Sequence, residues 1–442
     1  MFANRLLVIG GVAAGLSAAS RARRLDPNLH ITVLEKGPHI SYSACGLPYY
    51  LAGQVREASD LVVHDAAFFR EQREIEVLTG HEAVEIEPGR RRVRAVVTET
   101  RQEKAFHFDR LIVATGANAE FRMQNEECRT AFNANTLGGA MALQAFLAQA
   151  NPRRAVVLGG GYIGLEMAEA LRTRGLDVTV LERGSEILDG FGAEIAGRVE
   201  AAMTGLGVLL VKGCPALAVR EGEVISEAGR HPADVVVVAT GLRPNVELAE
   251  AAGIAVGSTG AIAADDRMQA NLPGVYAAGD CAESVHLVTG RAVWIPLGTT
   301  ANKQGRVAGE NAAGGNARFP GVVGTMVTKV FGLECARTGL SEAQAAGYRV
   351  VSATIEHVTR AHYLGGQKIV ATLLAERGSG RLLGAQMAAP EGAAKRIDVL
   401  ATALHARMTV EQVSNLDLSY APPVAPVWEA VLIAAQNLLK QL

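Results

Sequence analysis

The sequence predicts an α/β protein built around two parallel sheets and completed by a C-terminal domain of mixed strands and helices. Its 442 residues exceed what one hydrophobic core usually organises. A strand, a glycine turn and a helix follow one another in LLVIGGVAAGLSAASRARR, and the same order recurs in AVVLGGGYIGLEMAEALRTRG. Beyond residue 320, apolar runs between glycine-rich turns indicate an antiparallel sheet, and two helical stretches complete it.

The composition narrows the class of partner. A formal net charge of -2 provides no global basic field, which argues against nucleic acid and anionic membranes. No apolar run reaches the ~18 residues of a membrane span. The N-terminal arginine cluster follows the apolar stretch, whereas a signal peptide has its basic residues first. We therefore expect a cytoplasmic protein that contacts neither nucleic acid nor a membrane.

Both glycine turns have the spacing of a Rossmann-like dinucleotide-binding turn. Such glycines allow a tight turn and let a diphosphate approach a helix N-terminus, and an acid after the next strand can bind ribose hydroxyls. One copy alone would also suit a structural turn, whereas two copies with matching acids favour FAD and a nicotinamide nucleotide. The residues are Gly10, Gly15 and Glu35 in the first copy, where Val12 replaces the middle glycine, and Gly159, Gly161, Gly164 and Glu182 in the second.

Three other strands end where a cofactor would approach them. FDRLIVATGANA and ADVVVVATGLRPN both end in Ala-Thr-Gly, and GVYAAGDCAES ends in Gly-Asp. With Lys36 after Glu35, these stretches add cofactor-binding candidates: Lys36, Thr115, Gly116, Gly241, Gly279 and Asp280.

With these motifs the chain resembles the two-dinucleotide flavoprotein disulfide reductases over nearly its whole length. The resemblance implies that the first turn and Asp280 hold FAD and that the second turn holds NAD(P)H. Glu182 should repel a 2′-phosphate and favours NADH, while Arg183 beside it keeps NADPH open. The implied layout places FAD-binding segments at 1–117 and 244–320, a nicotinamide domain at 118–243 and a dimerisation domain at 321–442.

A single cysteine stands in SYSACGLPYY, since Tyr50 follows Cys45 where disulfide enzymes have a second thiol. Pro48 predicts a helix starting near Leu47, and a helix N-terminus lowers the pKa of a nearby thiol. The chain has five cysteines and no CxxC, which argues against a zinc site or any other metal centre. Cys281, beside Asp280, is expected to serve packing. Cys45 would then pair with an external thiol or be oxidised to a sulfenic acid, unless it is only a small residue beside a turn.

SYSACGLPYY resembles the active-site stretch of the coenzyme A disulfide reductases, matching at Ser41, Cys45, Leu47, Pro48 and Tyr49. The NADH oxidase and peroxidase branch usually lacks the Leu-Pro-Tyr continuation. The resemblance implies that coenzyme A supplies the second sulfur. It also implies contacts to coenzyme A at Ser17, Arg21, Arg24, Ser41, Arg73 and Asn302. For the arginines, the alternative is a basic helix face that contacts only solvent.

Two tyrosines of the C-terminal domain, Tyr363 and Tyr420, match the same family. There they reach the active site of the partner subunit and assist the departing thiol, as a phenol can. Either could instead be structural, and Leu364 and Gly365 depart from the family pattern beside Tyr363.

We therefore expect a homodimeric NAD(P)H-dependent coenzyme A disulfide reductase acting on a small-molecule disulfide, with Cys45 as nucleophile. Persulfide or polysulfide reduction and NADH oxidation would use the same residues. A flavoprotein that senses thiol redox state is the non-enzymatic alternative.

Overall fold

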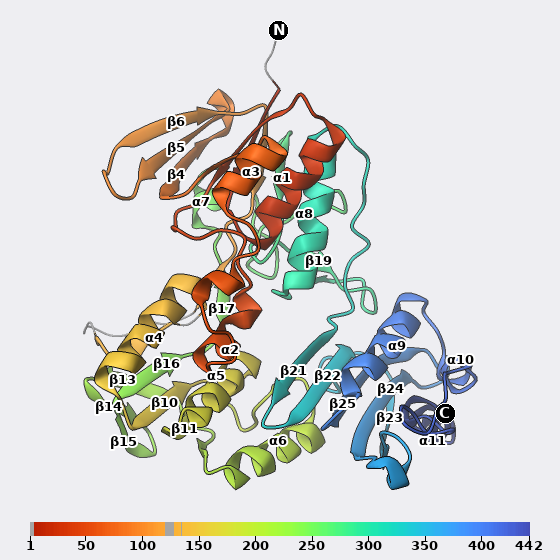
Figure 1. Cartoon of the computed structure of the whole chain (residues 1–442). Coiled ribbons are helices and arrows are strands. Elements are labelled where there is room, and N and C mark those ends of the chain that lie inside the picture. The colour runs from red at the N-terminus through yellow and green to blue at the C-terminus, as the bar shows by residue number, and fades with distance from the viewer. Residues whose placement is uncertain (1–3, 120–127, 134) are drawn as a thin grey trace.

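The structure, a computed structural model, describes residues 4–119, 128–133 and 135–442. Its elements form three units, which lie at the top, lower left and lower right of Figure 1. Two units contain a parallel sheet and the third an antiparallel sheet covered by helices, so the predicted fold class is confirmed. Among the described residues, no helix is long and apolar enough to cross a membrane.

The first unit has a five-stranded parallel sheet buried on both faces. Alternate strand residues, such as Val8 and Ile112, pack under helices α1 and α8, while their neighbours Leu7 and Leu111 pack against a small antiparallel sheet. The elements are, in sheet order, β18 (Val275–Ala277), β7 (Arg110–Val113), β1 (Arg5–Ile9), β2 (His30–Leu34) and β3 (Glu76–Leu78); the small sheet β4 (His81–Glu87), β5 (Arg92–Val97) and β6 (Glu103–His107); and the helices α1 (Ala13–Leu25), α3 (Ala66–Arg73), α7 (Glu247–Ala251) and α8 (Gly298–Ala312).

The second unit repeats this arrangement. Val157 and Val237 face helix α5, and Val156 and Val236 face another small antiparallel sheet. The repeated sequence pattern is therefore a structural repeat. Its elements are, in sheet order, β12 (Leu209–Val211), β11 (Asp177–Leu181), β10 (Arg154–Leu158), β16 (Val235–Val238) and β9 (Ala131–Phe132); the small sheet β13 (Ala216–Arg220), β14 (Gly222–Ser226) and β15 (Gly229–Ala233); and the helices α4 (Leu137–Ala150), α5 (Tyr162–Thr173) and α6 (Ala193–Gly205).

Short segments connect the units. β8 (Ala117–Ala119) pairs antiparallel with β17 (Leu242–Pro244) where the chain passes between the two parallel sheets. β19 (Ser284–Val285) and β20 (Ala292–Val293) form a hairpin. Helix α2 (Leu47–Leu51) leaves the first unit and packs against α4 and α5 of the second, as the ribbon in Figure 1 shows.

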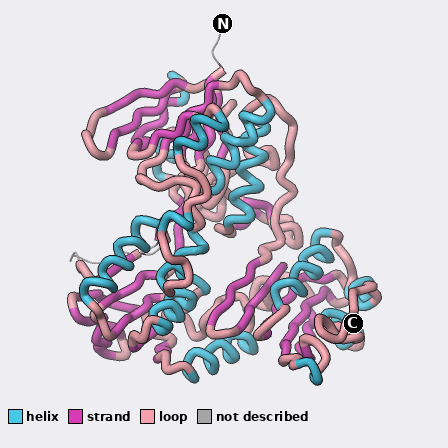
Figure 2. Tube along the Cα trace, in the orientation of Figure 1, coloured by secondary structure: helices cyan, strands magenta, loops and turns pink. Residues whose placement is uncertain are grey.

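The C-terminal unit is an antiparallel sheet with helices against it, as the sequence predicts. Helix α9 packs on β22 and β25, and α11 packs on β23 and β24 (Figure 2). The elements are, in sheet order, β21 (Met326–Val330), β22 (Leu333–Gly339), β25 (Leu382–Ala389), β24 (Lys368–Glu376) and β23 (Val350–Val358), with the helices α9 (Ala393–His405), α10 (Val410–Ser414) and α11 (Ala430–Leu439).

Candidate active site

The first glycine turn leaves no room for side chains. Gly10 has φ +111°, and a Cβ there would lie 2.1 Å from the carbonyl oxygen of Ala114. A Cβ on Gly15 would lie 1.9 Å from the carbonyl oxygen of Gly10. Both glycines are therefore needed to bring the N-terminus of α1 against the sheet. The Glu35 carboxylate accepts hydrogen bonds from the N–H groups of Gly11 and Gly37, each at 2.8 Å, which fixes its orientation at the edge of the turn.

The second turn has the same geometry. A Cβ on Gly159 (φ +106°) would lie 2.2 Å from the Ala239 carbonyl oxygen, and one on Gly164 would lie 2.0 Å from that of Gly159. Glu182 accepts from two backbone N–H groups at 2.5 Å, as Glu35 does. Gly161 is the N-cap of the twelve-residue helix α5 and provides no side-chain cap, and a Cβ there would meet nothing within 4 Å. The N–H groups of this turn are thus available to an anionic ligand.

Asp280 is an acceptor that the protein leaves open. Burial raises the pKa of its carboxyl group to about 6, and no hydrogen bond to that group is made by the described residues. The preceding Gly279 donates its N–H to the buried Gln304 at 2.9 Å, which ties the strand end to α8. A hydroxyl-bearing chain such as the ribityl of FAD fits this acceptor together with the first glycine turn.

The remaining cofactor candidates line the strand ends. The Thr115 hydroxyl donates to the Asn245 carbonyl at 2.7 Å, and Gly116 has φ +70°. Lys36 and Gly241 are exposed, and Gly241 has φ +119°.

Cys45 is an exposed thiol between the two parallel-sheet units. It lies in a short 3₁₀ turn, Ala44–Gly46, and α2 begins at Leu47 as predicted. Tyr50, at the position of the missing second cysteine, is 9% exposed and packs in the core with Leu47. All five cysteines are free, and Cys281 is fully buried as expected of a packing residue.

The predicted low pKa of the Cys45 thiol is wrong for the folded chain. Partial burial raises this pKa, and the charges of Glu166 and Asp280 raise it further. Helix α2 has only five residues, so its dipole is outweighed by the loss of solvation and by two carboxylates.

Two residues near the thiol were not predicted, Tyr162 and Glu166 on α5. Burial raises the pKa of Tyr162 to about 12, and charges on Cys45, Asp280 and Glu166 add to the shift. Glu166 accepts a hydrogen bond from the Thr328 hydroxyl at 2.6 Å, and burial raises its pKa. Both belong to the first turns of the helix that follows the second glycine motif. Their position on the helix that follows a glycine motif is the sequence feature that could have identified them.

The residues expected to contact coenzyme A gather on one face of the first unit. The Ser17 hydroxyl donates to the Asn302 side chain at 2.6 Å, joining α1 to α8. The pKa of Arg24 is lowered by burial and then by the charges of Arg73, Arg21 and Arg306, so these four cations lie close together. Arg306 was not predicted. Arg21 is partly neutralised by an ion pair with Glu310 at 2.5 Å, which leaves Arg24, Arg73 and Arg306 as the less compensated charges.

Ser41 lies at the entrance to the Cys45 segment with φ +50°. Its N–H donates to the Gly11 carbonyl at 3.0 Å, and its own carbonyl accepts from Val63 at 2.9 Å. These two bonds hold a left-handed conformation that is unusual for serine and direct the chain from the glycine turn toward the thiol.

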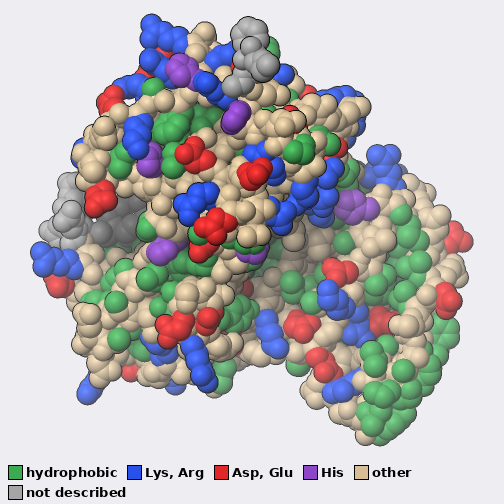
Figure 3. Space-filling model, turned by 45° about the horizontal axis from the view of Figure 1, so that its top comes forward, with side chains coloured by type: hydrophobic (Ala, Val, Ile, Leu, Met, Phe, Trp, Pro, Cys, Tyr) green, Lys and Arg blue, Asp and Glu red, His purple; other side chains and the backbone are tan. Residues whose placement is uncertain are grey.

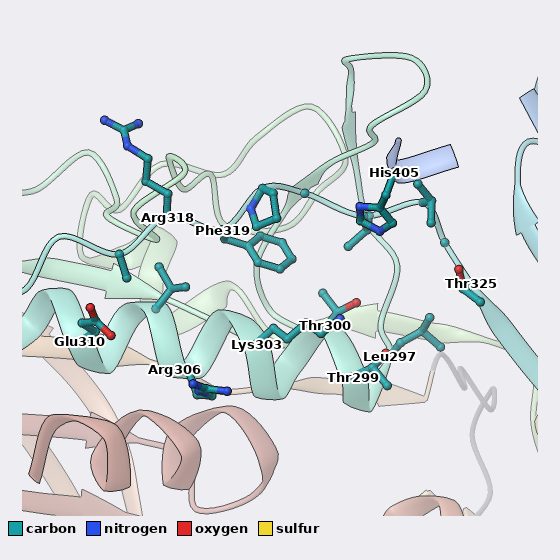
Figure 4. A pocket seen from close by; sticks show the side chains of 17 residues that line it. Leu297, Thr299, Thr300, Lys303, Arg306, Glu310, Arg318, Phe319, Thr325 and His405 are labelled. Atoms are coloured by element: carbon teal, nitrogen blue, oxygen red, sulfur yellow. The ribbon is translucent and has the colours of Figure 1, made fainter. Parts of the chain in front are cut away.

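A cavity of about 340 Å³ lies along the other side of α8, bounded by the connection 317–325 and by His405 of α9. Figure 4 shows Lys303 and Arg306 on α8, with Arg318 on the connection above. In this view Arg306 extends from α8 toward the N-terminal segments below it. The space-filling view in Figure 3 shows Lys and Arg side chains gathered above a hollow beside the C-terminal unit.

Tyr363 and Tyr420 are 68% and 54% exposed. The loops that carry them are joined by a hydrogen bond from Ala361 N–H to the Pro422 carbonyl at 3.2 Å. Val424, Val427 and Trp428 beside them are also exposed, and apolar side chains gather on this lobe in Figure 3. Within one chain these loops lie at the outer part of the C-terminal unit, away from α2 (Figure 1).

Two family models match this architecture. Pyridine nucleotide-disulphide oxidoreductase matches residues 4–305, and the dimerisation domain of the same family matches residues 325–431. The chain belongs to this family. As a pyridine nucleotide-disulphide oxidoreductase, it is an NAD(P)H-dependent flavoprotein that binds FAD and acts on sulfur compounds.

Several relatives of this oxidoreductase carry names that specify a sulfur substrate. It is 38% identical to an NAD(P)H sulfur oxidoreductase (CoA-dependent) of Pyrococcus abyssi over 98% of each chain. It is 27% identical to a coenzyme A disulfide reductase of Staphylococcus haemolyticus, over 95% of this chain and 96% of the other. Its structure matches an NAD-dependent persulfide reductase from A. fulgidus with a TM-score of 0.95 and 40% identity, over 99% of this chain and 83% of the other.

Proposed function

We propose that this oxidoreductase uses NAD(P)H to reduce persulfide or polysulfide sulfur by means of coenzyme A, with Cys45 as the nucleophile. The observation that carries the proposal is one exposed thiol placed between the FAD turn and α5, with no second cysteine beside it. Greater identity to CoA-dependent sulfur and persulfide reductases than to coenzyme A disulfide reductases supports persulfide as the acceptor. Persulfide or polysulfide reduction is therefore preferred here to coenzyme A disulfide reduction, which the sequence alone favoured.

The reaction follows from the single thiol. The Cys45 thiolate attacks the coenzyme A sulfur of a coenzyme A persulfide, a Cys45–S–S–CoA bond forms, and hydrosulfide leaves. Two electrons then break this bond and, with protons from solvent, return the Cys45 thiol and free coenzyme A. FAD held by the first glycine turn and Asp280 would supply these electrons from NAD(P)H. Because burial, Glu166 and Asp280 raise the Cys45 pKa, the attack should speed up as pH rises toward that pKa.

Coenzyme A is the proposed ligand of the basic face. Its 3′-phosphate and diphosphate suit the group formed by Arg24, Arg73 and Arg306, since guanidinium groups bind phosphate through paired donors. Ser17 and Asn302 border this face, and Ser41 lies between it and the thiol. The proposed path therefore runs from the arginines along α1 to Cys45.

Tyr363 and Tyr420 are proposed to act on Cys45 of the partner subunit in a homodimer. Their exposure, the apolar residues beside them and the match to a dimerisation domain support this assignment. A phenol hydroxyl would donate a hydrogen bond to the departing sulfur.

The test is anaerobic NADH and NADPH oxidation with coenzyme A persulfide, and separately with coenzyme A disulfide, while hydrosulfide is measured. We expect one hydrosulfide per nucleotide with persulfide and none with Cys45→Ser, which should keep its flavin spectrum. Cys281→Ser is the matched control and should keep turnover, because Cys281 is buried. Turnover that survives in Cys45→Ser would refute the proposal.

Coenzyme A disulfide reduction is the second candidate, favoured by the Leu47-Pro48-Tyr49 continuation after the cysteine. Its first step forms the same mixed disulfide and releases coenzyme A thiolate in place of hydrosulfide. Faster turnover with coenzyme A disulfide than with persulfide would select this candidate and leave the role of Cys45 unchanged.

A further inference from the structure

The cavity at the start of α5 contains a cation supplied by the C-terminal unit. The cavity has a volume of about 320 Å³, and its lining includes Gly161, Tyr162 and Gly241 of the second unit. Arg337 of β22 and Gln344 line the same cavity from the C-terminal unit. A side chain from the third unit therefore faces the glycine turn that binds the nicotinamide nucleotide.

The Arg337 guanidinium is held in place without an ion pair among the described residues. Nη2 donates to Gln344 Oε1 at 3.0 Å, and the guanidinium carbon lies 5.8 Å from the centre of the Phe191 ring. A Cβ on Gly190 would come within 1.8 Å of Nη1, so the loop backbone packs directly against the group. The buried Nε has no hydrogen-bond partner in the described part of the chain.

The charge of Arg337 is poorly compensated by the protein. Burial lowers its pKa, and Asp189 opposes that shift only at a distance beyond an ion pair. Nearby His286 has its pKa lowered to about 4, first by burial and then by the charge of Arg337, so it is neutral at pH 7. An arginine does not lose its proton in a protein, and a partly buried cation without an ion pair is costly. An anionic ligand in the cavity would offset that cost.

We propose that Arg337 binds the diphosphate of NADH or NADPH and thereby closes the nucleotide site from the C-terminal unit. The diphosphate is favoured over a 2′-phosphate because Arg337 shares the cavity with Gly161 and Tyr162, where the free N–H groups of α5 begin. Glu182, the acid expected at the ribose, is not among the described residues that line this cavity. Arg337 would thus tie nucleotide binding to the position of the dimerisation domain.

The experiment uses the FAD-loaded enzyme and titrates ADP-ribose, NADH and NADPH calorimetrically under anaerobic conditions. In Arg337→Met we expect all three dissociation constants to rise by similar factors, on the order of tenfold or more, because a charge-assisted contact to phosphate is lost. The KM values should rise with kcat at saturation little changed. Arg230→Met, which removes an exposed arginine from the same unit as the turn, should leave all three constants unchanged.

Three outcomes would overturn the proposal. Unchanged ADP-ribose affinity in a folded Arg337→Met enzyme would mean that the residue only packs against Phe191 and Gly190. A loss confined to NADPH would assign the residue to the 2′-phosphate. If Arg337→Met does not retain FAD, Arg337→Gln decides. It keeps a polar side chain but removes the charge, so full ADP-ribose affinity in that variant would also refute a diphosphate contact.

Discussion

At Cys45, local chemistry depends on residues far away in the sequence. The residue is exposed as a whole, yet its thiol is partly buried, and this burial and two carboxylates, Glu166 and Asp280, raise the pKa of the thiol. A thiol with a raised pKa is protonated to a larger extent near neutral pH. The reactivity of this thiol is therefore set by α5 and by the strand end at Asp280 as much as by its own turn.

Replacing Glu166 by Gln should lower the pKa of the Cys45 thiol. A carboxylate near the thiol disfavours the thiolate, and the amide removes that negative charge while keeping an acceptor for Thr328. The measurement is the rate of iodoacetamide alkylation of the NADH-reduced enzyme against pH, and its midpoint should move to lower pH.

Glu169→Gln is the matched control, because Glu169 lies three residues further along α5 and does not act on the Cys45 pKa. Its profile should coincide with that of the parent enzyme. A Glu166→Gln midpoint that stays in place or rises would contradict the electrostatic explanation.

At the scale of elements, α1 and α8 determine the geometry of the basic face. A Cβ on Gly305 or Gly309 of α8 would lie 2.2 or 2.1 Å from a carbonyl oxygen of α1. Only glycine allows this approach, which brings Asn302 to Ser17 and Arg306 to Arg24. Two helices almost 300 residues apart in sequence thus form one surface.

Gly309→Ala should destabilise the holoenzyme by about 1–3 kcal/mol, because the added methyl group overpacks the helix contact. Gly197 lies on the exposed face of α6, where an added Cβ would meet nothing within 4 Å. Gly197→Ala should therefore stabilise its helix by about 0.5–1 kcal/mol. Thermal unfolding followed by flavin fluorescence measures both. Similar midpoints for the two variants would mean that the α1–α8 contact relaxes without cost.

At the scale of the molecule, the C-terminal unit carries an exposed apolar surface with Tyr363, Tyr420, Val424, Val427 and Trp428. Exposed apolar patches of this kind mark interfaces. The loops with the tyrosines lie away from α2 of their own chain, so the proposed action of Tyr363 or Tyr420 on Cys45 requires a partner subunit.

Mixed dimers test this arrangement. Cys45→Ser and the double variant Tyr363→Phe/Tyr420→Phe should each be nearly inactive alone. Coexpressed with separate affinity tags, they should regain roughly a quarter of parental activity, since random pairing gives half heterodimers, each with one complete site. Homodimers of each variant purified apart are the control. Purified heterodimers without activity would place the tyrosines at the site of their own chain, and a double variant that is active alone would place them outside catalysis.

Much of the fold could be predicted from the sequence because its signals are local. Glycine spacing, strand hydrophobicity and the position of Pro48 are imposed by neighbouring residues, and they predicted both parallel sheets, the antiparallel sheet and the start of α2. The glycines at 10, 15, 159 and 164 were recognisable because steric exclusion at each turn requires them. The single thiol could also be recognised from the sequence, because Tyr50 occupies the position of the second cysteine.

Only the tertiary structure decided the interactions between segments that are distant in sequence. The sequence suggested a low Cys45 pKa from a local helix, but burial and the carboxylates of two other segments reversed the direction. Arg306 lies on the basic face, Glu310 partly neutralises Arg21, and Arg337 of another unit lines the cavity at the second glycine turn. Solvation and Coulomb energy depend on distance in space, which the order of residues along the chain does not contain.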